Sequence, residues 1–283
     1  MRLRLDVAYD GTEFYGWATQ PGFRTVEETI SNAWGVILRS EPPNLVVGGR
    51  TDAGVHARGS VVHLDVNDAR LQTLRNRGSW TAEQAARQRL KGVLPDDILV
   101  KHVSRAPKGF DARFSALHRR YEYRIADSVP VRDPLRRRDT VNYDVKLDVE
   151  AMDEVAQTLC GLHDFAAFCR RREGATTVRT LLKYRWRRDE AGVLIADVQA
   201  DAFCHSMVRA LVGAIVRVGE GKFTAETVKE ILLARQRDSR MTVMPAHGLS
   251  LEEIVYPPDH LVGQRAEEAR ATRSLPGPTS QGA

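Results

Sequence analysis

The chain has 283 residues, of which 42% are hydrophobic and 28% are charged, and its formal net charge is +5. This composition excludes a largely disordered protein, and the length gives room for about two domains. No apolar run reaches the roughly 18 residues that a membrane-spanning helix needs, and the first residues lack the apolar core of a signal peptide, so we expect a cytoplasmic protein with no membrane association.

The first half of the chain predicts the element order βαββαβ. Leu3, Leu5 and Val7 alternate with polar residues, which is typical of a half-buried strand. Thr25 and Glu28 have the spacing of a capping box, which predicts the start of a helix. The predicted elements are a strand at 2–9, a helix at 26–37, strands at 45–47 and 61–66, a helix from Thr81 to about Leu90, and a strand at 98–103.

The second half predicts the same order with one additional helix. Tyr121, Tyr123 and Ile125 share one face of its first strand. The predicted elements are a strand at 120–125, a helix after Asp148, strands at 178–188 and 193–200, an apolar helix at 207–218, an additional helix at 225–234, and a strand at 249–255.

Two tandem βαββαβ units indicate an α+β protein with two ferredoxin-like domains, each an antiparallel sheet with helices on one face. We expect an N-terminal domain at 1–112, a C-terminal domain at 113–258, and an active-site cleft between them. Residues 259–283 are polar and end in a stretch rich in Pro, Gly and Ser, which predicts a disordered tail.

The glycine-rich segment 48–59 is the first candidate site. It carries Asp52, with Arg50 two positions earlier, and its glycines permit unusual backbone angles or the close approach of a ligand. It matches neither the dinucleotide fingerprint nor the Walker phosphate loop. An aspartate that only satisfies its own turn is the alternative interpretation of Asp52.

Arg209 and Tyr121 are candidates in the second half. Arg209 lies early in the most apolar predicted helix, where it either extends to solvent or pairs with a buried anion. Tyr121 is either a core residue of its strand or a ring that contacts a ligand.

Basic residues gather in two stretches, which favours a polyanionic partner, although a solvated basic surface is the alternative. The two stretches are Arg136–Arg137–Arg138 and the positions Arg170, Arg171, Arg172, Arg179, Lys183, Arg185, Arg187 and Arg188.

The three cysteines, Cys160, Cys169 and Cys204, lack metal-ligand spacing, and we expect three free thiols in a reducing compartment. The histidines form no zinc set, so we expect no metal, and the zinc deaminase signature is absent.

Five segments together resemble the tRNA pseudouridine synthase A family, over residues 1 to about 256. They are YDGTEFYGW at 9–17, GRTDAGVHA at 49–57, FDARFSA at 110–116 with RYEY at 120–123, MVR at 207–209, and PAHGL at 245–249. Their order along the chain is that of the family.

The resemblance implies that the chain isomerises uridine to pseudouridine, with Asp52 as the nucleophile and no cofactor. It also implies that Tyr121 contacts the target base, that Arg209 pairs with Asp52, and that Arg50 helps to displace the base. The implied substrate is the anticodon stem-loop of transfer RNA at positions 38, 39 and 40, bound by a homodimer. Attack at C1′, attack at C6 and a glycal route all remain open.

Two rival functions use parts of the same pattern. A non-catalytic RNA-binding protein with RRM-like sheets would need aromatic residues in RNP motifs on which bases stack. Tyr121 and Tyr123 match that pattern only weakly. A glycosylase would also flip a base and use a carboxylate, but it would release free uracil.

Overall fold

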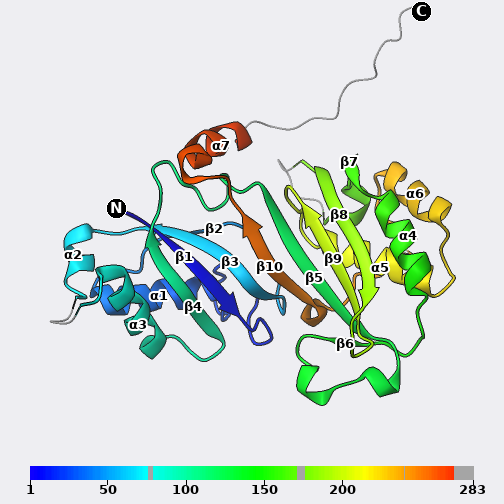
Figure 1. Ribbon diagram of the computed structural model, residues 1–283, viewed down its shortest axis with the longest axis horizontal. Helices are drawn as coiled ribbons and strands as arrows, with labels where there is room; N and C mark the ends of the chain where they lie inside the picture. Colours follow the sequence, from blue (N-terminus) through cyan, green and yellow to red (C-terminus); the bar gives the residue numbers. More distant parts are fainter. Residues whose placement is uncertain (76–78, 171–175, 239, 271–283) are drawn as a thin grey trace, which may run out of the picture. The chain divides into compact units, whose positions relative to one another are not determined.

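A computed structural model describes residues 1–75, 79–170, 176–238 and 240–270 (Figure 1). Contacts within the chain separate two compact units: unit 1 comprises Met1–Arg120 with Ala246–Arg270, and unit 2 comprises Tyr121–Pro245. This division differs from the predicted boundary at 112/113. None of the helices in these ranges is both long and apolar enough to span a bilayer.

The sheet of unit 1 has the strand order β4-β1-β3-β10, and β2 also pairs with β3. Its strands are β1 (Arg2–Tyr9), β2 (Leu45–Val47), β3 (His56–Asp65), β4 (Ile98–Arg105) and β10 (Leu249–Val255). The pairs β1–β3, β1–β4 and β2–β3 are antiparallel, as predicted. β10 was predicted as the last strand of the second domain, but it pairs in parallel with the start of β3 and therefore belongs to unit 1.

Helices α1 and α3 of unit 1 pack against each other, and α3 also packs on β4 (Figure 1). The unit-1 helices are α1 (Val26–Leu38), α2 (Asp68–Gln72), α3 (Ala82–Val93), α7 (Val262–Ala269) and the 3-10 helices η4 (Ala246–Gly248) and η5 (Asp259–Leu261). The predicted start of this helix at Thr81 is confirmed, and Thr81 and Gln84 form a capping box there.

The predicted capping box at Thr25 is wrong, because its side chain makes no capping hydrogen bond. Backbone carbonyls take its place: Gly16 O accepts from Val26 N at 3.2 Å, and Trp17 O accepts from Glu27 N at 3.0 Å. The first N–H groups of α1 are thus satisfied by the segment that connects β1 to α1.

The tail predicted from residue 259 is wrong for its first part, since η5 and α7 lie there. Val262 and Ala266, one helical turn apart, are 1% and 2% exposed. Ser115 Oγ donates to Val262 O at 2.8 Å, which anchors α7 to the segment before β5. In the sequence these two apolar positions stand among polar residues, so the composition of the segment did not indicate a helix. Residues 271–283 lie outside the described ranges.

The sheet of unit 2 has the order β5-β9-β8-β7, and β6 pairs in parallel with β5. Its strands are β5 (His118–Ala126), whose first three residues belong to unit 1, β6 (Val141–Asn142), β7 (Gly161–Asp164), β8 (Val178–Arg188) and β9 (Leu194–Ala200). The pairs β7–β8 and β8–β9 are antiparallel, so strand pairing in both units is mostly antiparallel and the α+β class is confirmed.

Helix α4 of unit 2 packs on β8 and on α5. The helices of this unit are α4 (Val149–Thr158), α5 (Met207–Gly219), α6 (Ala225–Ala234) and the 3-10 helices η1 (Val129–Val131), η2 (Pro134–Arg136) and η3 (Ala166–Phe168). Eleven of the thirteen residues of α5 are buried, which agrees with its apolar sequence.

Candidate active site

Asp52 lies in the connection between β2 and β3, and its backbone is held from both sides. Trp17 N donates to Thr51 O at 3.1 Å, and Gly54 N donates to Phe14 O at 3.1 Å. Thr51 Oγ1 and Tyr9 Oη form a buried hydrogen bond of 2.8 Å. The Asp52 side chain is half-buried, so this carboxylate has a fixed backbone and some access to solvent.

Close backbone approach explains two glycines near Asp52. A Cβ on Gly11 would lie 2.0 Å from Val55 O, and a Cβ on Gly16 would lie 2.8 Å from Thr51 O. Gly16 also has a φ of 88°, which L side chains rarely adopt. The β1–α1 connection and the Asp52 loop are therefore packed backbone to backbone.

His56 joins three segments of unit 1. Its Nδ1 lies 3.0 Å from Gly11 N and 3.1 Å from Asp10 Oδ1, and its Nε2 lies 3.0 Å from His247 O. The side chain of His56 is 9% exposed. His56 was not among the predicted site residues, although it falls inside the GRTDAGVHA segment.

Arg50 is exposed and lies in the same loop as Asp52. Tyr121 and Arg209 belong to unit 2, so the four predicted site residues are divided equally between the units. Tyr121 is 6% exposed, and its ring meets Phe203 edge-on, with 5.1 Å between centroids. Phe203 was not predicted as a site residue, although it lies shortly before the MVR segment at 207–209.

Arg209 is the third residue of α5 and is half-buried. Its Nε donates to Met244 O at 2.7 Å, while its own carbonyl accepts from Met244 N at 3.2 Å. Tyr123 Oη donates to the next carbonyl, Pro245 O, at 2.8 Å. Burial raises the pKa of Tyr123, and the nearby positive charge of Arg209 opposes this rise. Tyr123 therefore stays protonated at neutral pH and remains a hydrogen-bond donor.

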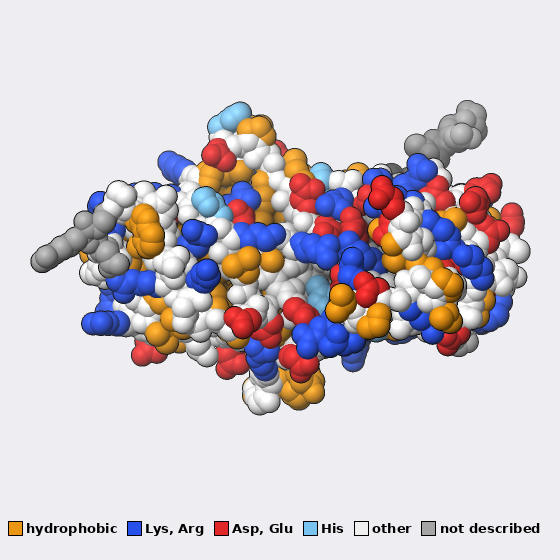
Figure 2. Space-filling model, turned by 60° about the horizontal axis from the view of Figure 1, so that its bottom comes forward, with side chains coloured by type: hydrophobic (Ala, Val, Ile, Leu, Met, Phe, Trp, Pro, Cys, Tyr) orange, Lys and Arg blue, Asp and Glu red, His pale blue; other side chains and the backbone are white. Residues whose placement is uncertain are grey.

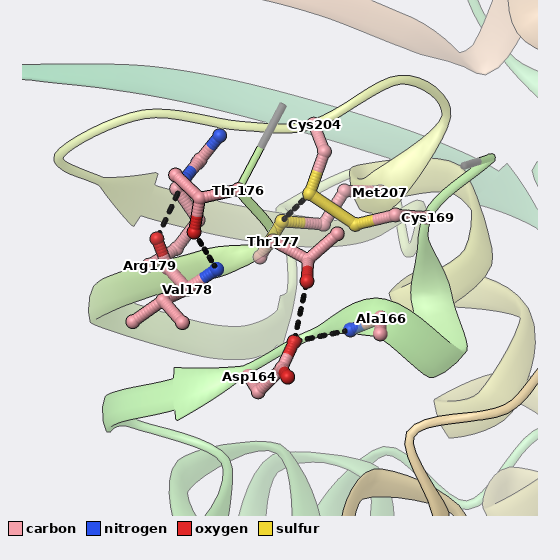
Figure 3. Close-up of a disulfide and its surroundings, with 9 residues drawn as sticks. All are labelled: Asp164, Ala166, Cys169, Thr176, Thr177, Val178, Arg179, Cys204 and Met207. Atoms are coloured by element: carbon pink, nitrogen blue, oxygen red, sulfur yellow. Dashed lines mark hydrogen bonds between the residues drawn. A yellow bond between two sulfur atoms is a disulfide. The ribbon is translucent and has the colours of Figure 1, made fainter. Parts of the chain in front are cut away.

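The prediction of three free thiols is wrong for two of the cysteines. Cys169 and Cys204 form a disulfide with 5.7 Å between their Cα atoms, although they are 35 positions apart (Figure 3). Arg170 N donates to His205 O at 3.0 Å, which aligns the two segments. Cys160 is a free thiol whose pKa is raised by burial. Over the described ranges, His, Cys, Asp and Glu side chains form no group of three that could hold a metal ion.

Many of the predicted basic residues already pair with acids. Lys183 pairs with Asp197, Arg185 with Asp153, and Arg188 with the buried Asp127. Figure 2 likewise shows Lys and Arg side chains interspersed with Asp and Glu on the face that it presents. Arg171 and Arg172 lie outside the described residues. The cluster at 136–138 is exposed, although Arg136 pairs with Asp139 at 2.8 Å.

Comparison with known proteins identifies the family. A family profile described as tRNA pseudouridine synthase matches residues 155–257. Three proteins called tRNA pseudouridine synthase A align over nearly the whole chain. They come from Leifsonia xyli subsp. xyli (53% identity, 97% of this chain and 98% of the relative), Frankia casuarinae (51%, 99% and 98%) and Streptomyces griseus subsp. griseus (50%, 98% and 95%). The chain therefore belongs to the tRNA pseudouridine synthase A family.

Proposed function

We propose that Asp52 is the nucleophile with which this chain isomerises uridine to pseudouridine in tRNA. Isomerisation of a tRNA uridine is the reaction of the family to which the chain belongs. The observation that best supports this role of Asp52 is that backbone hydrogen bonds hold its loop in place. Thr51 O and Gly54 N are both hydrogen-bonded to the β1–α1 connection. A nucleophile held in this way loses little entropy when it attacks.

The chemistry needs a carboxylate and no change of oxidation state. The bond from ribose C1′ to uracil N1 breaks, the base turns, and a bond from C1′ to C5 forms while the C5 proton moves to a nitrogen. Atoms and electrons balance without a redox partner, so the reaction requires no cofactor. An ionised Asp52 can attack C1′ or C6, or promote a glycal route, and all three routes begin with the same carboxylate.

The remaining site residues act on the flipped base and on Asp52. Tyr121 contacts the target base, and Arg50 helps to displace it from its stack. Arg209 pairs with the carboxylate of Asp52 and orients it for attack. The MVR segment at 207–209 supports the last proposal, because the family resemblance pairs its arginine with the catalytic carboxylate.

We further propose that the two units are ferredoxin-like domains that enclose the active-site cleft. The order β4-β1-β3 with β2 on the far side of β3 supports this proposal for unit 1. The proposed substrate site is the anticodon stem-loop at positions 38, 39 and 40, and the proposed assembly is a cytoplasmic homodimer.

Replacing Asp52 by Asn tests the proposed function. An amide cannot act as the nucleophile, so Asp52→Asn should bind tRNA normally while turnover falls by at least about 1,000-fold. Turnover is measured as tritium release from tRNA labelled at uridine C5. Asp65→Asn, which alters an exposed aspartate at the other end of β3, serves as the control and should retain activity.

Residual turnover of Asp52→Asn within tenfold of wild type would remove Asp52 from the mechanism. Release of free uracil by the wild-type protein would contradict isomerisation itself, because an isomerase leaves the mass of the RNA unchanged.

A further inference from the structure

Two large aromatic side chains lie in contact with each other on the surface of unit 1. Tyr15 and Phe23 are 54% and 43% exposed, yet their ring centroids lie only 4.3 Å apart with an interplanar angle of 37°. Single exposed aromatics are common on protein surfaces, whereas an exposed aromatic pair offers a continuous apolar face to solvent.

The segment that carries the pair is held in place by its own hydrogen bonds. Tyr15 N donates to Arg24 O at 2.9 Å, Phe23 N donates to Gln20 O at 3.2 Å, and Gln20 Nε2 donates to Tyr15 O at 3.0 Å. These bonds close residues 15–24 into a compact loop. The two rings are thus preorganised, and a ligand that stacks on them need not order them first.

Arg24 fastens this loop to the rest of unit 1. Its guanidinium makes two hydrogen bonds to the Asp97 carboxylate, at 2.7 and 2.9 Å. It also lies over the Phe14 ring, 4.0 Å from the centroid. The charge of Arg24 is therefore directed toward Asp97. Binding of a ligand to the exposed aromatic face then depends on stacking and apolar contact.

Tyr15 sits between two residues that contact the Asp52 loop. On one side, Phe14 O accepts from Gly54 N. On the other side, a Cβ on Gly16 would lie 3.1 Å from Asp52 C. Consecutive Cα atoms are about 3.8 Å apart, so the backbone of Tyr15 lies within roughly 10 Å of the backbone of Asp52. A polynucleotide that presents one base to Asp52 has its neighbouring bases within that range.

We infer that Tyr15 and Phe23 form a stacking platform for an unpaired base of the RNA substrate, next to the uridine that is isomerised. This inference rests on the proposed function of Asp52. Aromatic side chains bind unpaired bases by stacking regardless of sequence, because every base has a π-face. The platform holds the flanking nucleotide while the target base leaves its stack, and so it acts mainly in substrate binding.

The test measures tRNA binding and turnover separately. The variants are Tyr15→Ala, Phe23→Ala, their double variant, and the conservative Tyr15→Phe and Phe23→Tyr. Trp80→Ala is the matched control, because Trp80 is 48% exposed in the same unit but precedes α3. Binding is measured both in wild type and in an Asp52→Asn background, which separates a failure of the platform from a failure of the nucleophile.

We expect the double variant to weaken tRNA binding by about 5- to 150-fold, the range for loss of one stacked base. The salt dependence of binding should stay unchanged, since no phosphate contact is lost. The kcat at saturating tRNA should change less than the Kd, and the conservative variants should bind like wild type. A 2-aminopurine placed beside the target uridine should be quenched by the wild-type protein and not by the double variant.

Binding by the double variant within twofold of wild type, or equal loss with Trp80→Ala, would overturn the inference. Dissociation of an oligomer in the double variant would also overturn it, because the pair would then be a protein interface. If the double variant does not fold, quenching of 2-aminopurine by the wild-type protein and its loss in Phe23→Ala still decide the matter.

Discussion

His63 shows how a single buried residue makes stability depend on pH. It lies on β3 and is 4% exposed, and its Nδ1 accepts a hydrogen bond from Ala112 N at 2.9 Å. Burial lowers the pKa of His63, and the positive charge of Arg2 lowers it further. Protonation would remove the acceptor for Ala112 N, so the folded state favours the neutral ring.

The first residue-scale prediction follows from the direction of this shift. Below the ordinary histidine pKa of 6.5, His63 binds a proton more readily in the unfolded state than in the folded state, so stability falls as the pH drops through 6.5 toward the lower folded-state pKa. Denaturant unfolding at pH 7.5 and 5.5 measures this loss. His63→Asn keeps an acceptor that does not titrate and should reduce the difference between the two pH values.

The control is His102→Asn, which alters an exposed histidine on β4. Burial also lowers the pKa of His118 and His247, so His63→Asn removes only part of the pH dependence. An unchanged difference between pH 7.5 and 5.5 would show that His63 does not contribute to it.

At the scale of elements, the β1–α1 connection supports both the start of α1 and the Asp52 loop. Its carbonyls at Gly16 and Trp17 accept from the first turn of α1, and Phe14 O accepts from Gly54 N. Damage to this connection should therefore affect stability and catalysis together.

Gly11→Ala tests that coupling. The new Cβ would meet Val55 O, a backbone atom that cannot rotate away, and relief requires a backbone shift at the end of the Asp52 loop. We expect a loss of about 1–3 kcal/mol in the free energy of unfolding and a reduced kcat. Gly92→Ala in α3 is the control, because nothing lies within 4 Å of its added Cβ. Wild-type kcat in Gly11→Ala would contradict the coupling.

The disulfide joins the end of η3 to the segment before α5, and this connection yields the second element-scale prediction. Cross-linking two residues 35 positions apart stabilises by roughly 3–4 kcal/mol through the entropy of the unfolded chain. Reductant should lower the unfolding midpoint of the oxidised protein, and Cys169→Ser should remove this sensitivity. Cys160→Ser should preserve it. If wild type unfolds at the same midpoint with and without reductant, the disulfide contributes nothing to stability.

At the scale of the whole molecule, net charge alone overstates the attraction for RNA. The chain carries +5, but Lys183, Arg185 and Arg188 each pair with an aspartate of unit 2. Side chains that are already paired add less to phosphate binding. The exposed cluster at 136–138 is the better candidate for contact with the RNA backbone.

The whole-molecule prediction concerns the salt dependence of tRNA binding. The logarithm of the affinity should fall linearly with the logarithm of salt concentration, and Arg137→Gln should reduce the slope by about one. Arg136→Gln should reduce it less, because Arg136 already pairs with Asp139. Affinities measured between 50 and 200 mM salt give the slope. Equal slopes for wild type and Arg137→Gln would show that Arg137 makes no phosphate contact.

The family, the reaction and most of the helices and strands could be predicted from the sequence, because each prediction rests on residues that are close together along the chain. The alternation of apolar and polar residues predicted β1. The structure also has four further elements at the predicted residues, namely β2, β8, α6 and β10. The motif around Asp52 indicated the family that the comparisons confirm. The catalytic roles of Asp52, Arg50, Tyr121 and Arg209 stay predictions, to be tested by mutation.

Only the tertiary structure decided which distant segments meet. The sequence predicted strand β10, but parallel pairing with β3 places it in unit 1. Thr25 had the right spacing for a cap, yet the carbonyls of Gly16 and Trp17 took that role. Cys169 and Cys204 are too far apart in sequence for spacing to reveal a disulfide. The periodicity of apolar residues indicates which face of a helix or strand is buried. It does not indicate strand pairing, helix capping by a distant segment or a disulfide, because these depend on contacts between residues that are remote along the chain.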